Sequence, residues 1–428
     1  MRTSYLLLYF LPLFFSSLLS PAIIIHAGYL IDGDSSNSSP EMSITIEGDE
    51  ISSIQVGYIT PQSNDEYIDL SGYTVLPGLM DMHVHLSSEY TKNSYQEKIT
   101  LNSSDYAIRA VRNAEKTLLA GFTAVRNLGD TEGVSISLRN AISKGIVPGP
   151  RIFSSGTTIA SSGGHGDSTN SLNKSLTSDP GPQHGIVNGL EDASKAVRHR
   201  YKEGADLIKI TATGGVLSNA KSGENPQFTQ EEIEKIVAIA EDYGFKVAAH
   251  AHGAEGIKRA VRAGVHSIEH GTLMDSEAMK LMREKGTYYV PTIIAGLWVA
   301  EKAEDPDFFP ELVRPKAAEI GPKIKGTFAK AYQAGVKIAY GTDTGVSEHG
   351  KNAEEFRHMV DAGMPPIKAI QAATLEASKL LGMQDVLGTI AKGKKADIIA
   401  VSGNPLEDIS VLEEVDFVMK GGKIYKSP

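Results

Sequence analysis

Two histidines stand two residues apart at the end of an apolar run. Residues 81–86 read DMHVHL and follow the segment YTVLPGL. In a β-strand the side chains at i and i+2 point to the same side, so His83 and His85 would present two imidazoles from one strand tip. Neutral imidazole is a good ligand for Zn²⁺ and similar ions. The same spacing occurs in ordinary surface strands, so a metal site needs support from the rest of the chain.

Other side chains with metal-binding or proton-transfer chemistry also lie in or after short apolar runs. Lys209 is inside ADLIKITATGG, where a charge is costly to bury. The remaining candidates are His165 in SSGGHGD, His250 and His252 in VAAHAHG, His270 in SIEHGT and Asp343 in AYGTDTG. Half of the 12 histidines therefore fall at predicted strand ends. This convergence, and no single residue, favours a common site.

A pair of divalent cations explains this set of side chains. The predicted metal ligands are His83, His85, Lys209, His250, His270 and Asp343. An ammonium is a poor ligand, but Lys209 after reaction with CO₂ would be a carbamate that bridges two ions. A water held by such ions loses a proton near neutral pH, since the pKa of a zinc-bound water is about 7. The resulting bridging hydroxide would attack a carbonyl, and Asp343 would carry the proton to the leaving amine.

Each of these side chains has a simpler explanation when it is taken alone. Lys209 could extend toward solvent or pair with Asp206, and Asp343 could cap the next helix. His252 could stand outside the ligand set. The patterns around other residues indicate packing, structural or exposed positions, namely His266, Tyr288, Tyr289, His349 and His358.

The elements that must position these side chains alternate between strands and helices. From about residue 79 to 381, eight apolar runs alternate with amphipathic stretches such as TQEEIEKIVAIAEDYG. Repetition of this unit predicts an α/β fold, a closed (β/α)8 TIM barrel over residues 78–381, with its active site at the carboxyl ends of the strands. An open doubly wound sheet fits less well because no G-x-G-x-x-G loop follows the first run.

Both ends of the chain carry a different, β-rich pattern. Segments such as SITIEGDEISSIQVG and VDFVMKGGKIYKS alternate apolar and polar residues. We expect residues 23–77 and 382–428 to form one small β-sandwich domain. Residues 1–22 combine an early arginine, a short apolar stretch and small residues near position 22, which predicts a cleaved signal peptide and a secreted or periplasmic protein. An uncleaved N-terminal anchor is the alternative.

Composition limits the classes of function. The chain has 42 Lys and Arg against 52 Asp and Glu, a net charge of −10, which argues against a nucleic-acid or anionic-membrane partner. It has no cysteine, so disulfides and thiolate chemistry are excluded. A metal must therefore be bound by histidine, carboxylate or modified lysine.

The segments together resemble the amidohydrolase superfamily over nearly the whole mature length, in order and spacing. They are PGLMDMHVHL, KITATGGV, VAAHAHG, SIEHGT, GTDTG and KGKKADIIAV. SSGGHGD, with the lysine and histidine segments, resembles the branch of metal-dependent dipeptidases and carboxypeptidases. The resemblance implies release of a C-terminal proline, or of arginine or lysine, from dipeptides or N-acyl amino acids. It also implies two divalent ions, with Zn²⁺ expected, a carboxylated Lys209, substrate contacts from His165 and His252, and a homo-oligomer.

Other functions on the same barrel stay open. The chain is also similar to imidazolonepropionase, which opens a cyclic amide with one metal and lacks the bridging lysine, so Lys209 favours the two-metal form. Amidases that split N-acyl-phenylalanine bonds share the motifs. A non-catalytic relative acting as a binding protein would usually have lost ligands, and here every expected position is occupied. A basic substrate side chain would need an acidic partner, for which Asp167 and Glu348 are candidates.

Overall fold

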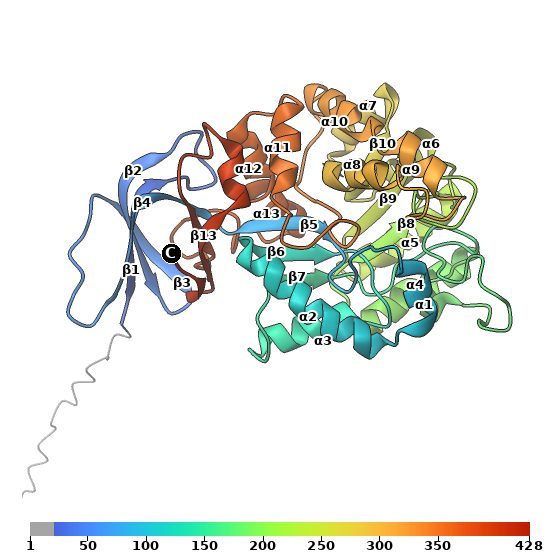
Figure 1. The fold of residues 1–428 in the computed structure, drawn as a ribbon, viewed down its shortest axis with the longest axis horizontal. Helices are drawn as coiled ribbons and strands as arrows, with labels where there is room; N and C mark the ends of the chain where they lie inside the picture. The colour runs from blue at the N-terminus through green and yellow to red at the C-terminus, as the bar shows by residue number, and fades with distance from the viewer. Residues whose placement is uncertain (1–20) are drawn as a thin grey trace, which may run out of the picture.

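A barrel of parallel strands with helices around it forms the larger part of the molecule (Figure 1). The computed structural model describes residues 21–428, so the first 20 residues of the predicted signal peptide lie outside the described residues. The ring strands are β5 (Leu79–Val84), β6 (Phe122–Asn127), β7 (Arg151–Ser154), β8 (Ile208–Thr211), β9 (Val247–Gly253), β10 (Ser267–Leu273) and β11 (Tyr288–Val290). They pair in parallel as β5-β6-β7 and β8-β9-β10-β11.

Single bridges close the ring between these two groups of strands. Ile159, which follows β7, pairs in parallel with Ile210 of β8. On the other side Ile338 pairs with Tyr289 of β11, and the amide of Met82 donates to the carbonyl of Tyr340 at 2.8 Å. The eighth predicted run is therefore present as an extended segment. It makes isolated bridges instead of a continuous ladder, which is why it carries no strand label.

Helices surround the ring, as the alternating pattern predicts (Figure 1). They are α1 (Ser94–Thr100), α2 (Ser103–Leu119), α3 (Val134–Ser143), α4 (Leu190–Glu203), α5 (Gln230–Asp242), α6 (Ala254–Ala263), α7 (Ser276–Lys285), α8 (Ile293–Lys302), α9 (Arg314–Ile320), α10 (Lys323–Gln333), α11 (Glu354–Asp361), α12 (Pro366–Ala372) and α13 (Leu375–Leu381). Helix α5 illustrates the local rules: Thr229 and Glu232 form a capping box at its start, and Ile233, Ile236 and Val237 bury one face. Within residues 21–428, no helix is long and apolar enough to cross a bilayer.

Strands from both chain ends form a second sheet beside the barrel (Figure 1). They are β1 (Ile23–Leu30), β2 (Ser39–Glu47), β3 (Glu50–Val56), β4 (Glu66–Pro77), β12 (Ile398–Val401), β13 (Val415–Lys420) and β14 (Lys423–Lys426). The 12-residue β4 joins the two ends because it pairs with β1 along one edge and with β12 along the other. The predicted small β unit is thus built from both ends, and hydrogen bonds connect all of its strands in one continuous sheet.

The small sheet has its own apolar core, which includes Ile25, Ile44, Val75 and Phe417. The change from sheet to barrel falls between Pro77, the last residue of β4, and Leu79, the first residue of β5. The predicted domain boundaries, 23–77 with 382–428 and 78–381, remain predictions.

Candidate metal centre

One cavity at the carboxyl ends of the barrel strands gathers every predicted site residue. Its volume is about 270 Å³. The eight predicted residues that line it are His83, His85, His165, Lys209, His250, His252, His270 and Asp343. They come from β5, β8, β9, β10 and the loops that follow the ring segments. This is the position at which a (β/α)8 barrel places its active site.

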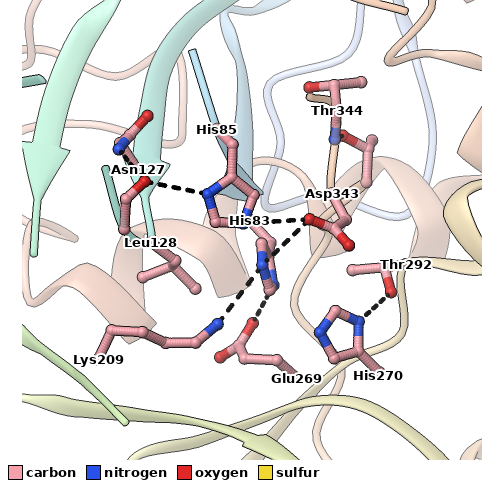
Figure 2. Close-up of polar contacts among 12 residues, drawn as sticks. His83, His85, Asn127, Leu128, Lys209, Glu269, His270, Thr292, Asp343 and Thr344 are labelled. Atoms are coloured by element: carbon pink, nitrogen blue, oxygen red, sulfur yellow. Dashed lines mark hydrogen bonds and ion pairs between the residues drawn. The ribbon is translucent and has the colours of Figure 1, made fainter. Parts of the chain in front are cut away.

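The innermost atoms lie close to one another (Figure 2). Asp343 Oδ1 is 3.4 Å from His83 Nε2 and 3.2 Å from His85 Nε2. Lys209 Nζ is 3.5 Å from His83 Nε2. One nitrogen of His83, one nitrogen of His270 and a carboxylate oxygen of Asp343 all lie within 4.8 Å of one another. These distances suit side chains that share one or two bound cations.

Each of the four ligand histidines uses one ring nitrogen for a contact outside the cluster. The outer contacts are His83 Nδ1 with Glu269 (3.0 Å), His85 Nδ1 with the carbonyl of Gly129 (3.0 Å), His270 Nδ1 with the hydroxyl of Thr292 (2.8 Å) and His250 Nε2 with the carbonyl of Gly214 (3.0 Å). Such contacts fix the tautomer and the ring orientation of a metal-binding histidine. The second nitrogens of His83 and His85 face Asp343 at 3.4 and 3.2 Å, where a shared cation could lie.

The electrostatic environment keeps these groups in their metal-binding forms. Burial is the largest cause that lowers the pKa of His83, His250 and His270 well below the ordinary value, so their imidazoles are neutral. Burial alone would raise the pKa of Asp343, but nearby His83, His85 and Lys209 hold it below its usual value. Asp343 therefore remains a carboxylate.

Lys209 points toward this cluster and not toward the alternative partner considered from the sequence. Asp206 pairs with Arg139 at 2.6 Å and accepts the amide of Ser154 at 2.8 Å. Burial lowers the pKa of the Lys209 ammonium to about 8. The structure therefore does not contain the alternative pairing of Lys209 with Asp206, because the side chain of Lys209 lines the cavity while Asp206 lies before the strand.

The backbone is strained at three residues of the site. His270, Thr292 and Asp343 adopt positive φ angles of 69°, 54° and 59°. Residues other than glycine rarely occupy this left-handed region, and such strain persists only where the surrounding structure imposes it. At Asp343 the strain turns the carboxylate toward His83 and His85 just after the eighth ring segment.

Glu269 and Arg126 are buried charged residues that the sequence reasoning did not single out. Besides accepting from His83, the carboxylate of Glu269 accepts from Arg126 Nη2 at 2.8 Å, and Arg126 Nε donates to the carbonyl of Met82 at 2.6 Å. Asp81 is also buried and accepts from the amide of His83 at 3.0 Å. The sequence held a signal for all three, because a charged residue within an apolar strand beside a ligand needs a partner.

We expect Glu269→Gln to weaken both metal binding and folding. Loss of the negative charge leaves Arg126 buried without its partner, which costs about 3–5 kcal/mol. Loss of the acceptor for His83 should reduce metal affinity by roughly 10–100-fold. Chemical denaturation and metal titration of the apoprotein would measure the two effects. Glu277→Gln is a suitable control because Glu277 is 64 % exposed and pairs with Lys258 at the surface. A Glu269→Gln protein with unchanged metal affinity would contradict this role.

The two predicted substrate contacts, His165 and His252, lie on one side of the cavity. The ring of His165 stacks on that of His250 with centroids 4.3 Å apart. His252 Nδ1 is 2.9 Å from the hydroxyl of Thr272. Both rings are therefore held in place with one nitrogen still available. Their contact with a substrate remains a prediction.

The acidic residues suggested as partners for a basic substrate do not line the cavity. Asp167 accepts the amides of Gly163 and Thr169, both at 2.9 Å, so its carboxylate stabilises its own loop. Glu348 is 56 % exposed and pairs with Lys351 at 3.2 Å. The suggestion that either recognises a basic side chain is wrong for this arrangement.

The histidine and tyrosine residues expected to be structural make packing contacts. His349 is buried and its Nε2 bonds the carbonyl of Ser88 at 2.9 Å. The hydroxyl of Tyr289 donates to the carbonyl of His270 at 2.8 Å, and His266 accepts the amide of Val247. Tyr289 thereby supports the strained backbone of a ligand residue.

The residues fit a divalent cation by their chemistry. Asp343 Oδ1 is buried, and within residues 21–428 its imidazole neighbours, His83 Nε2 at 3.4 Å and His85 Nε2 at 3.2 Å, are not aligned for a regular hydrogen bond. Buried polar atoms without partners are rare, and they call for a specific explanation such as an ion. Neutral imidazoles and a carboxylate that converge on such an atom match the donors that zinc and similar metals prefer.

Comparison with known proteins agrees with this site. The model of the Amidohydrolase family matches residues 74–425. A solved Xaa-Pro dipeptidase with methionine bound in its active site is 57 % identical, with a TM-score of 0.93 and coverage of 95 % of this chain and 100 % of that one. A solved prolidase complexed with N-methylphosphonate-L-proline is 33 % identical, with a TM-score of 0.87 and coverage of 95 % and 100 %.

Among curated proteins, ochratoxinase of Aspergillus niger is 34 % identical over 433 residues, which span 95 % of this chain and 87 % of the relative. The chain therefore belongs to the amidohydrolase family, and it is an enzyme of the hydrolase class. The barrel fold predicted from the alternating strands and helices is confirmed by these structural relatives.

Proposed function

We propose that this chain is a binuclear metal-dependent peptidase that releases the C-terminal amino acid from dipeptides or N-acyl amino acids. The observation that carries the proposal is the convergence of four histidines, Asp343 and Lys209 in one buried cavity. The likeness to an Xaa-Pro dipeptidase at 57 % identity supports the substrate class.

Two divalent ions, with zinc expected, would be held by the predicted ligand residues. Lys209 would join the ligand set as a carboxylated side chain, formed when its amine adds CO₂ and releases a proton. The environment supports this modification, because the Lys209 amine is buried with its pKa lowered to about 8 and lies 3.5 Å from the ring of His83. When bound, such ions polarise a carbonyl and lower the pKa of water.

The chain's own residues supply the remaining chemistry. The carboxylate of Asp343 accepts the proton of the attacking water and returns it to the nitrogen of the leaving amine. Its position 3.2 Å from His85 and 3.4 Å from His83 fixes the carboxylate for both transfers. His165 and His252 stand on the same side of the cavity, where they would bind the amino acid that leaves.

The cavity favours an apolar leaving residue, with proline as the first candidate. Its wall contains several apolar side chains, including Leu128, Val216, Leu217, Val299, Ile320, Ile324 and Val346. Among the lining residues within the described part of the chain, 21–428, Asp343 is the one carboxylate. A bound arginine or lysine side chain would therefore lie against apolar groups with no opposite charge, which is costly.

A panel of dipeptides tests this specificity. Substrates with C-terminal proline, methionine or phenylalanine should have kcat/KM at least about tenfold higher than those with arginine or lysine, because a buried charge lacks a partner. Chelator-treated enzyme should be inactive and should recover with added zinc. Preference for the basic residues would contradict the apolar assignment. A stoichiometry of one metal would point instead to the cyclic-amide hydrolases.

We also propose export of the chain on the basis of its first 22 residues. Expression of the full-length gene followed by N-terminal sequencing of the mature protein tests this proposal. A mature chain that begins near residue 22 is the expected result. An intact N-terminus in a cell-associated protein would contradict cleavage.

A further inference from the structure

A buried lysine behind the cavity has no acidic partner. Lys316 lies on α9 and is 9 % exposed. Its ammonium donates to the carbonyls of Gly215 at 3.1 Å, Ser218 at 2.7 Å and Ala220 at 2.7 Å. Within residues 21–428, no acidic side chain forms a salt bridge with this ammonium, and burial is the one cause that shifts its pKa. The charge is thus compensated by carbonyl dipoles alone, although a buried charge without an opposite charge is unfavourable.

The carbonyls bound by Lys316 belong to the loop between β8 and α5, which forms one wall of the cavity. Val216 and Leu217 of this loop line the cavity, and the hydroxyl of Tyr95 donates to the carbonyl of Leu217 at 2.9 Å. Gly215 faces His165 so closely that an added Cβ would lie 2.3 Å from the imidazole ring. Gly215 therefore lies between the Lys316 ammonium, which binds its carbonyl, and the ring of His165.

The wall in front of Lys316 carries two polar side chains, His165 and Tyr90. His165 Nδ1 is buried against Gly215, and the buried hydroxyl of Tyr90 lies beside Tyr95. Both side chains line the cavity, and Tyr90 packs against Tyr95, which holds the loop. The positive charge of Lys316 behind this wall, which no opposite charge compensates among residues 21–428, favours a negatively charged group of a ligand in this part of the cavity.

We infer that Lys316 makes the enzyme selective for substrates whose released amino acid carries a free carboxylate. This inference rests on the proposed function and deepens it. Lys316 is a positioning residue, because its hydrogen bonds go to the loop and not into the cavity. It acts in two ways: it holds Gly215 beneath His165, and it contributes positive potential where the substrate carboxylate would lie.

Kinetics with a matched pair of substrates test the inference. The pair is alanyl-proline and alanyl-prolinamide, which differ in the C-terminal charge. Wild-type enzyme should prefer the acid. Lys316→Met should raise KM for the acid about tenfold with little change in kcat, because an electrostatic contribution to binding is lost. Its kcat/KM for the amide should fall clearly less than that for the acid, because the amide loses only the loop contact and not the charge, so the preference for the acid falls.

Two further variants separate charge from loop position. Tyr95→Phe removes a hydrogen bond to the same loop without changing charge, so it should affect the acid and the amide in the same proportion. Lys316→Gln keeps hydrogen-bond donors but lacks the charge, so it should lose selectivity as Lys316→Met does. Equal effects of Lys316→Met on both substrates, or full selectivity in Lys316→Gln, would overturn the inference.

A binding measurement distinguishes failure of this inference from failure of the proposed function. If the wild-type enzyme hydrolyses neither substrate, the proposed function fails. Calorimetric titration of the metal-loaded protein with L-methionine and L-methioninamide then tests Lys316 without turnover. We expect the wild type to prefer methionine, and Lys316→Met to weaken methionine binding about tenfold and methioninamide binding clearly less. Equal binding of both ligands by the wild type would overturn the inference.

Discussion

Replacement of Lys209 by alanine should reduce kcat/KM by roughly a thousandfold or more. A pair of catalytic ions contributes several kcal/mol of transition-state stabilisation, and each 1.36 kcal/mol is a factor of ten in rate. Without the Lys209 side chain, whose amine lies 3.5 Å from His83, the site loses its proposed bridging ligand. Metal content should fall from about two ions per chain toward one. Elemental analysis and steady-state kinetics on the same preparation would measure both effects.

A small carboxylate offers a chemical rescue of this variant. Acetate or bicarbonate added to Lys209→Ala should enter the space left by the side chain and restore part of the activity and the metal content. Lys280→Ala is the matched control, because Lys280 is 68 % exposed on α7 and should leave activity unchanged. Full activity of Lys209→Ala without any added carboxylate would show that the lysine is no bridge.

The substitution Asp343→Asn should lower kcat by about 10²–10⁴-fold, the usual contribution of a positioned proton-transfer group. Asparagine keeps a side-chain oxygen near His83 and His85, so much of the ligand geometry is retained. It cannot accept and return a proton. The loss should therefore appear mainly in kcat, with a smaller change in KM, in protein whose metal content has been measured and restored with zinc.

Glu348→Gln provides the control for loss of a carboxylate close by in the sequence. Glu348 lies only five residues after Asp343 but is 56 % exposed and pairs with Lys351 at the surface. This variant should keep wild-type kcat. Near-normal kcat in metal-replete Asp343→Asn would assign proton transfer to another group. Loss of both ions from Asp343→Asn would show that the main role of the carboxylate is metal binding.

The sequence predicted the barrel, and it placed the candidate metal ligands on one rim, because both inferences depend on local patterns. Strands that end in histidine, lysine or aspartate have a fixed direction, and a (β/α)8 barrel brings all such ends to one rim. His83, Lys209 and His270 were therefore placed together without knowledge of any distance. The structure brings them to the same cavity.

The sequence was less informative about features of the site that depend on contacts between residues far apart in the chain. Asp167 and Glu348 sit near site residues in the chain, yet loop conformation directs Asp167 to backbone amides and Glu348 to the surface. Lys316 is more than 100 residues away from Gly215, and only the folded chain brings its ammonium 3.1 Å from that carbonyl. The sequence therefore gave no indication of this contact.

The sequence by itself determined the ring of strands, the identity of the donor atoms and the rim on which they lie, because strand periodicity and residue type are local properties. The tertiary structure alone decided which partner forms a hydrogen bond with each imidazole, which buried charges have an opposite charge nearby and which side chains line the cavity. Those features depend on atoms brought within a few ångströms from distant parts of the chain, as Glu269 with His83 and Lys316 with Gly215 demonstrate.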